Sequence, residues 1–68
     1  MEKLVGYLRN PPTGDYLKVN LLLTEVNRSA TVEGKDGTSY LVFQIRKDKI
    51  KKIANGELEV TSVVQEIP

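Results

Sequence analysis

Apolar and polar residues alternate over several stretches of this chain, as they do in strands that bury one face. The clearest case is residues 38–45, in which Leu41, Phe43 and Ile45 occupy every second position and so share one face. Residues 16–26 alternate in the same way and form the longest strand candidate. The pattern predicts strands over residues 3–8, 16–26, 30–33, 38–45 and 57–67.

Turn residues separate these segments. The loop at residues 10–15 contains Pro11 and Pro12, which fix φ and remove two amide donors, so the first strand must end there. The sequence Gly-Lys-Asp-Gly at residues 34–37 predicts a tight hairpin with Asp-Gly at its centre.

Two positions predict irregular strand geometry. Gly6, inside the first strand, marks a bulge or a close approach of another backbone. In the last strand Val63 and Val64 interrupt the alternation, which predicts a bulge near residues 61–62.

Residues 47–54 have two interpretations. In the first they form a short helix that Asp48 caps, with Ile50, Ile53 and Ala54 inward and Asn55-Gly56 at its end. In the second, Asn55-Gly56 is the turn of a β-hairpin. Packing decides between them, since a helix this short is marginal alone, and we expect one helical turn.

The order of these elements resembles that of the SH3-like small barrels, including their Sm-like relatives. Ile45-Arg46 resembles a dipeptide of Sm proteins, although Lys47 follows it where those proteins have glycine. Peptide-binding SH3 domains line their groove with aromatics that include tryptophan, whereas this chain has no tryptophan and only Tyr7 and Tyr16 flank the corresponding first loop. The resemblance implies a mainly β fold: a single five-stranded SH3-like barrel over residues 1–68, with one short helical turn between the fourth and fifth strands. An OB-like barrel is the alternative, and it resembles the chain less well because its helix follows the third strand.

Composition narrows the chemistry. A chain of 68 residues makes one domain and buries only about 60% of its unfolded surface. Cysteine and histidine are absent, which excludes disulfides and the usual zinc and haem sites, so no cofactor is expected. The commonest general base and the thiol nucleophile are missing too, and we do not expect an enzyme.

Nothing in the sequence predicts a membrane or a secretory route. The N-terminal segment lacks the long apolar run of a signal peptide. The longest apolar run, residues 21–23, is far too short to cross a bilayer. The expected location is the cytoplasm.

Charge is concentrated in one place. The net charge is +1, but residues 46–52 carry +4 and residues 53–68 carry −3. Clustered cations beside a sheet neutralise phosphates, and exposed aromatics stack on unpaired bases. We therefore expect weak binding of single-stranded nucleic acid, and the candidate residues are Arg46, Lys47, Lys49, Lys51, Lys52, Tyr16, Tyr40 and Lys18. Alternatively, the tyrosines are rim packing and the lysines form a solvated face that Glu57, Glu59 and Glu66 offset.

A protein-binding module is the second functional class. Leu22 and Val42 are apolar residues on the nominally outer faces of their strands, and as neighbours they would form an exposed patch. Pro11 and Pro12 stiffen a loop that could present a fixed surface. This alternative predicts a small adaptor or inhibitor, such as phages and mobile elements encode, or a homo-oligomer that includes a ring like those of Sm-like proteins.

Overall fold

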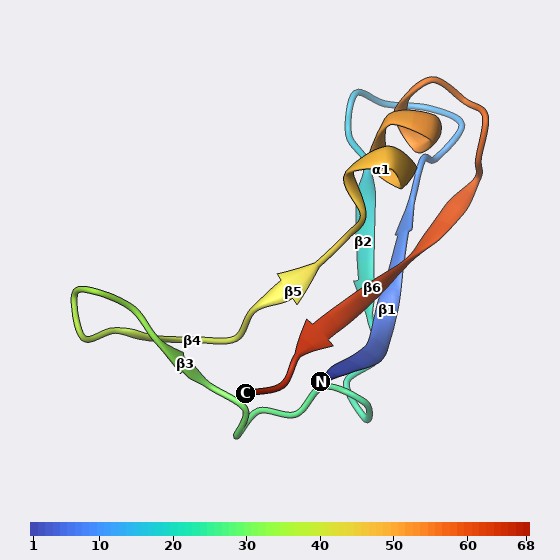
Figure 1. The fold of residues 1–68 in the computed structure, drawn as a ribbon. Coiled ribbons are helices and arrows are strands. Elements are labelled where there is room, and N and C mark those ends of the chain that lie inside the picture. The colour runs from blue at the N-terminus through green and yellow to red at the C-terminus, as the bar shows by residue number, and fades with distance from the viewer.

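The chain folds around an antiparallel sheet, and the computed structural model describes all of residues 1–68. Four strands in the order β2-β1-β6-β5 make a sheet that curls into a half-barrel (Figure 1). These strands are β1 (Glu2–Arg9), β2 (Lys18–Leu21), β5 (Phe43–Gln44) and β6 (Val60–Glu66). A separate two-stranded hairpin consists of β3 (Val32–Glu33) and β4 (Ser39–Tyr40), and the helix α1 (Lys47–Ala54) lies near one end of the sheet. The fold is therefore mainly β, as predicted.

The core is small and centred on β1. Val5 and Leu8 of β1 pack with Val63 of β6, and Phe43 and Ile45 lie half-buried against them. The alternation predicted Phe43 and Ile45 as interior residues, and this prediction is confirmed. Their segment is not one strand, however, because the chain leaves the sheet between β5 and β4.

Gly6 combines both of the features predicted for it. The register of β1 against β6 shifts between Leu4 and Gly6, which leaves Val5 as the extra residue of a bulge. A Cβ atom on Gly6 would also clash with the backbone carbonyl oxygen of Asn20 on β2. The bulge predicted near residues 61–62 is wrong, because the extra residue belongs to β1 and not to β6.

The longest predicted strand is much shorter in the structure. Only Lys18–Leu21 of residues 16–26 pairs as a strand, and the chain then turns. In this turn the backbone N–H groups of Glu25 and Val26 both donate to the carbonyl oxygen of Leu22, at 2.9 and 3.1 Å. The turn sends the following residues towards β6.

The buried side chain of Gln65 binds the backbone of this segment. Gln65 of β6 has no exposed surface, and its amide binds the backbone of Asn27 on both sides. The N–H of Asn27 donates to Oε1 at 2.8 Å, and Nε2 donates to the carbonyl oxygen of Asn27 at 2.7 Å. The amide thus acts as one residue of a neighbouring strand would, and the pair ties the loop after β2 to the centre of the sheet.

The helical interpretation of residues 47–54 is confirmed, but of the residues expected to face inward only Ile53 is buried, whereas Ile50 and Ala54 are exposed. Arg46 is the N-cap, in an extended conformation, and the N–H groups of Lys49 and Ile50 donate to its carbonyl oxygen at 3.1 Å. Asp48 does not cap the helix but lies in its first turn. At the other end the N–H of Gly56 donates to Ile53 and that of Glu57 to Lys52, which is the Schellman pattern, with Gly56 at a φ of +86°.

The predicted hairpin at residues 34–37 is also present, and it projects from the sheet as an arm (Figure 1). We call residues 31–42 the arm. Val32 pairs with Tyr40, and Gly37 has a φ of +81°. Asp36 accepts hydrogen bonds from the N–H of Thr38 at 3.0 Å and from the Tyr40 hydroxyl at 3.3 Å, and these bonds, the first above all, lower the pKa of Asp36.

Replacing Gln65 with leucine tests the importance of this amide. We expect Gln65→Leu to lower the free energy of unfolding by about 1–3 kcal/mol, since the N–H and C=O of Asn27 both lose their partner in part-buried bonds. Chemical denaturation followed by circular dichroism measures the change. The matched control is Gln44→Leu, which removes a bond of 3.1 Å to Glu66 at a more exposed position and should cost less than about 1 kcal/mol. Equal losses in the two variants would contradict the role given to Gln65.

Candidate nucleic-acid interface

The basic run forms the exposed side of α1. Ile53 is fully buried and fixes which side of the helix faces the sheet. Lys47, Lys51 and Lys52 are exposed, whereas Lys49 is half-buried. Lys47 and Lys51 are four residues apart, so they lie one above the other on the solvent side. Folding this segment as a helix therefore gathers the cations at one end of the molecule.

None of the helix lysines is neutralised by a close carboxylate. The structure contains two ion pairs within 4.0 Å, Arg46–Asp48 at 3.2 Å and Lys3–Glu25 at 3.4 Å. Glu57 and Glu59 form no ion pair with the helix, and Glu66 accepts a hydrogen bond from Gln44 at 3.1 Å instead. The offset that the glutamates could provide therefore does not occur at contact distance.

Asp48 is the one acidic residue of the helix itself, whereas Glu2 and Asp15 line the hollows at its two ends. Desolvation by the surrounding protein opposes its ionisation, but the attraction of Arg46 outweighs this, together with hydrogen bonds to the carboxylate and the charge of Lys49. The pKa of Asp48 is thereby held below its ordinary value of 3.8. Its negative charge also lies in the first turn of α1, where it interacts favourably with the helix dipole.

Tyr16 lies beside the last turn of the helix. Asn10 joins the proline loop to this turn, because its side-chain Nδ2 donates to the carbonyl oxygen of Ile53 at 3.0 Å. A shallow hollow of about 360 Å³ lies between loop and helix, and its lining includes Asp15, Tyr16 and Ala54. Tyr16 is 81% exposed, so its ring is available to a ligand that contacts the lysines.

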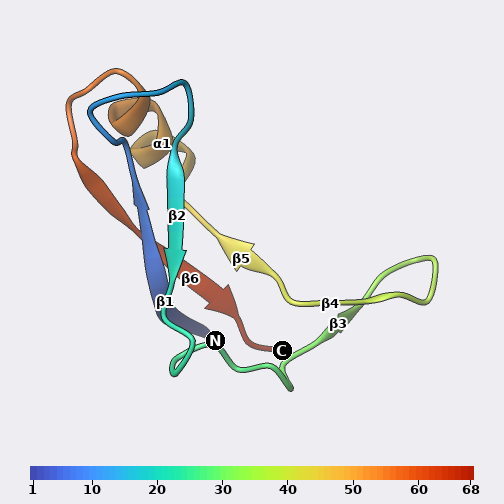
Figure 2. The same ribbon diagram turned by 180° about the vertical axis from the view of Figure 1, so that it is seen from behind.

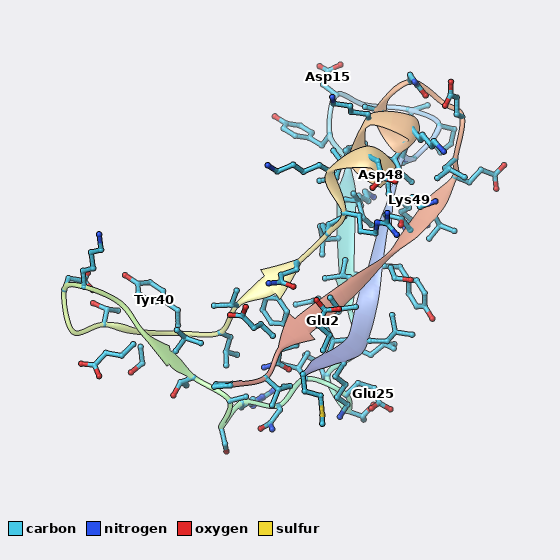
Figure 3. All side chains as sticks on the ribbon, viewed as in Figure 1. Glu2, Asp15, Glu25, Tyr40, Asp48 and Lys49 are labelled. Atoms are coloured by element: carbon cyan, nitrogen blue, oxygen red, sulfur yellow. The ribbon has the colours of Figure 1, made fainter.

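The other predicted aromatic is elsewhere. Tyr40 belongs to the arm, whereas Asp48 and Lys49 belong to the helix, and Figure 3 shows how far these labelled residues lie apart. The two tyrosines therefore do not share one surface. Lys18 begins β2, opposite Arg9 of β1, on the exposed side of the sheet.

A second hollow, of about 500 Å³, lies beside the N-terminal end of the helix. It brings together Arg46, Lys49, Glu2 and Ser62, which come from separate parts of the sequence. Nothing in the local pattern identified Glu2 or Ser62, because only the pairing of β1 with β6 places them here. Arg46 and Lys49 place two cations at this end of the helix, in a hollow that also contains the carboxylate of Glu2.

The residues proposed for a protein interface do not come together. Leu22 follows β2 and Val42 precedes β5, so they lie at opposite edges of the four-stranded sheet. The N–H of Leu22 donates to Val5 at 2.7 Å, and the carbonyl of Val42 accepts from Glu66 at 2.9 Å. Pro11 and Pro12 lie in the loop beside a further hollow, away from both.

Comparison with models of known protein families, with curated proteins and with solved structures finds no match for the chain. The only helix, α1, has eight residues, and no helix is long and apolar enough to cross a membrane. The geometry of the basic surface must therefore carry the functional conclusion.

The ionisation of Asp48 provides a test of this geometry. A depressed pKa in the folded state stabilises the fold above the ordinary value of 3.8, and this contribution is lost as the pH falls through the folded pKa. In an NMR titration of the side-chain carboxyl we expect a midpoint below 3.8, which moves upward in Arg46→Gln. Lys35→Gln, a change in the arm, should leave the midpoint unchanged. A titration midpoint of Asp48 that is the same in Arg46→Gln as in the natural chain would show that the ion pair does not form.

Proposed function

We propose that this protein is a small non-enzymatic module that binds single-stranded nucleic acid through the exposed side of α1. The observation that carries the proposal is the set of four helix lysines without a carboxylate partner, in a segment of net charge +4. Cations that no carboxylate neutralises remain free to bind phosphates, and their binding releases the counterions condensed on the nucleic acid.

The surface offers two kinds of contact. Lys47, Lys51 and Lys52 contact phosphates, which gives affinity without sequence preference. Tyr16 stacks on an unpaired base at the end of the helix, which favours single strands over duplexes. Both contacts lie at the same end of the molecule, so one strand of a few nucleotides can make them together.

The proposal also includes a fold class. The position of α1 between β5 and the last strand, β6, supports a relationship with SH3-like or Sm-like small barrels. We propose that the four-stranded half-barrel of this chain corresponds to the closed five-stranded barrel of that family.

Removing the three exposed lysine charges tests the proposal. We expect the variant Lys47→Gln, Lys51→Gln, Lys52→Gln to bind a labelled single strand more weakly at low salt. Its plot of log affinity against log salt should be less steep by about 2, since each phosphate contact contributes about 0.7 to the slope for single strands. Fluorescence anisotropy over a salt series measures both quantities.

The matched control removes three cations outside the helix: Lys3→Gln, Arg28→Gln and Lys35→Gln. It changes the net charge by the same amount but should keep most of the affinity and of the slope. The single variant Asp48→Asn removes the one acidic group of the helix and should bind more tightly than the natural chain. Equal losses in the two triple variants, or no binding at low salt, would overturn the proposal.

The stacking role of Tyr16 is tested separately. We expect Tyr16→Leu to weaken binding of single strands by about 1–3 kcal/mol, because leucine cannot stack on a base. Binding of a duplex of the same length should change little, since its bases are already stacked. The control Tyr40→Leu, on the arm, should change neither affinity. A Tyr16→Leu variant that loses affinity for both forms equally would assign Tyr16 a structural role instead.

A further inference from the structure

The edge of β2 is open and apolar. β2 pairs with β1 on one side and with no strand on the other (Figure 2). Val19 lies opposite Leu8 and Leu21 opposite Gly6, so both side chains lie on the face of the sheet that carries the core. They remain 52% and 39% exposed, which is unusual for residues on a core face. The apolar face of the sheet therefore extends to this edge, where no further strand covers it.

The free backbone groups belong to these same two residues. The N–H of Leu22 donates to Val5 of β1 at 2.7 Å, which sets the phase of the pairing. In an antiparallel pair the bonds alternate along the strand, so Asn20 and Lys18 also direct their backbone groups to β1. Val19 and Leu21 then direct their N–H and C=O groups outward, at an edge that a further strand could extend.

The chain alone buries little. Its radius of gyration is 13.5 Å, whereas a compact domain of this length has a radius of about 11 Å. Seven of the 68 residues are buried, and no cysteine is present to form a disulfide staple. Small chains with so little core are commonly completed by association.

We propose that two copies of this chain associate through β2, antiparallel across a twofold axis that passes through Asn20. Val19 of each copy then lies opposite Leu21 of the other, and these pairs exchange backbone hydrogen bonds. The two four-stranded sheets become one continuous sheet. The apolar side chains of both β2 strands pack together and extend the cores on either side of the axis.

The sequence of the strand favours a second copy as the occupant. Lys18 is the only charged residue of β2, and in this register it lies opposite Leu22 of the other copy. Opposed like charges are a common obstacle to the pairing of an edge strand with its own copy, and this register contains none. The apolar pairs of Val19 with Leu21 are complementary, and Asn20 meets its own copy as a polar pair.

The contact is independent of the proposed nucleic-acid surface. It uses β2 and not the solvent side of α1, so either proposal can fail without the other. The first measurement is the mass of the natural chain by sedimentation equilibrium at micromolar concentrations. We expect twice the mass of one chain, and a mass that stays at one chain over the whole range overturns the proposal and leaves the edge to a strand of another protein.

The second measurement tests the register. Asn20 would face Asn20 of the other copy in a pair without mutual hydrogen bonds, where the Cα atoms lie about 4.5 Å apart, within the range that a disulfide bridges. Asn20→Cys should therefore form a covalent dimer under mild oxidation, in which two thiols lose their protons and two electrons to the added oxidised glutathione. The natural chain contains no cysteine, so the introduced thiol is the only one that can react.

The matched control is Lys18→Cys, on the same face of the same strand. Its cysteine lies four positions from its own copy across the axis, about 14 Å away, beyond the reach of a disulfide. We expect Asn20→Cys to cross-link at least about tenfold faster than Lys18→Cys in non-reducing electrophoresis. Equal rates, or faster cross-linking of Lys18→Cys, would overturn the register and with it the proposed interface. Circular dichroism of both variants confirms that they retain the fold.

Discussion

The pairing of the Gln65 amide with the backbone of Asn27 determines how the chain is arranged in space. A primary amide in an apolar interior is costly unless both its donor and its acceptor are used. Here the backbone N–H and C=O of Asn27 use both, at 2.8 and 2.7 Å. The bond draws residues 22–31 across the end of the sheet, and it thereby ends β2 at Leu21 and directs the next segment into the arm.

The consequence is a sheet that is well tied at its centre and open at its margins. β1 and β6 pair over most of their length, whereas β5 has two residues and β2 has four. The N–H of Ile67 donates to the carbonyl oxygen of Met1 at 2.8 Å, which extends this central pair to the ends of the chain. The stability of so small a core depends on this one ladder, because it carries Val5, Leu8 and Val63.

The same arrangement separates three surfaces: the cationic helix, the arm and the open edge of β2. The sequence predicted the helix cations and Tyr16 as one candidate site, and the structure brings these together through the bond from Asn10 to Ile53. It places Tyr40 on the arm instead. The sequence alone could not show this, because Tyr40 is close to the helix along the chain. They are separated in space because the strand predicted over residues 38–45 is interrupted between β4 and β5. The polar residue Gln65, at the alternate position to Val63, was the available sign of a special interior role.

What the sequence by itself determined is local. The proline loop and the Gly-Lys-Asp-Gly hairpin depend on φ preferences, missing donors and turn residues, all within a few positions. The sequence also marked Asn55-Gly56 as a turn or helix end, but the packing of Ile53 decided that residues 47–54 form a helix. The tertiary structure alone decided where β2 ends, which strand carries the bulge and how the predicted fourth strand divides. These features depend on contacts between residues far apart in the chain: Gln65 with Asn27, 38 positions away, and Gly6 with the carbonyl of Asn20. An alternating pattern cannot encode them, because it records which face a residue prefers and not which strand lies beside it.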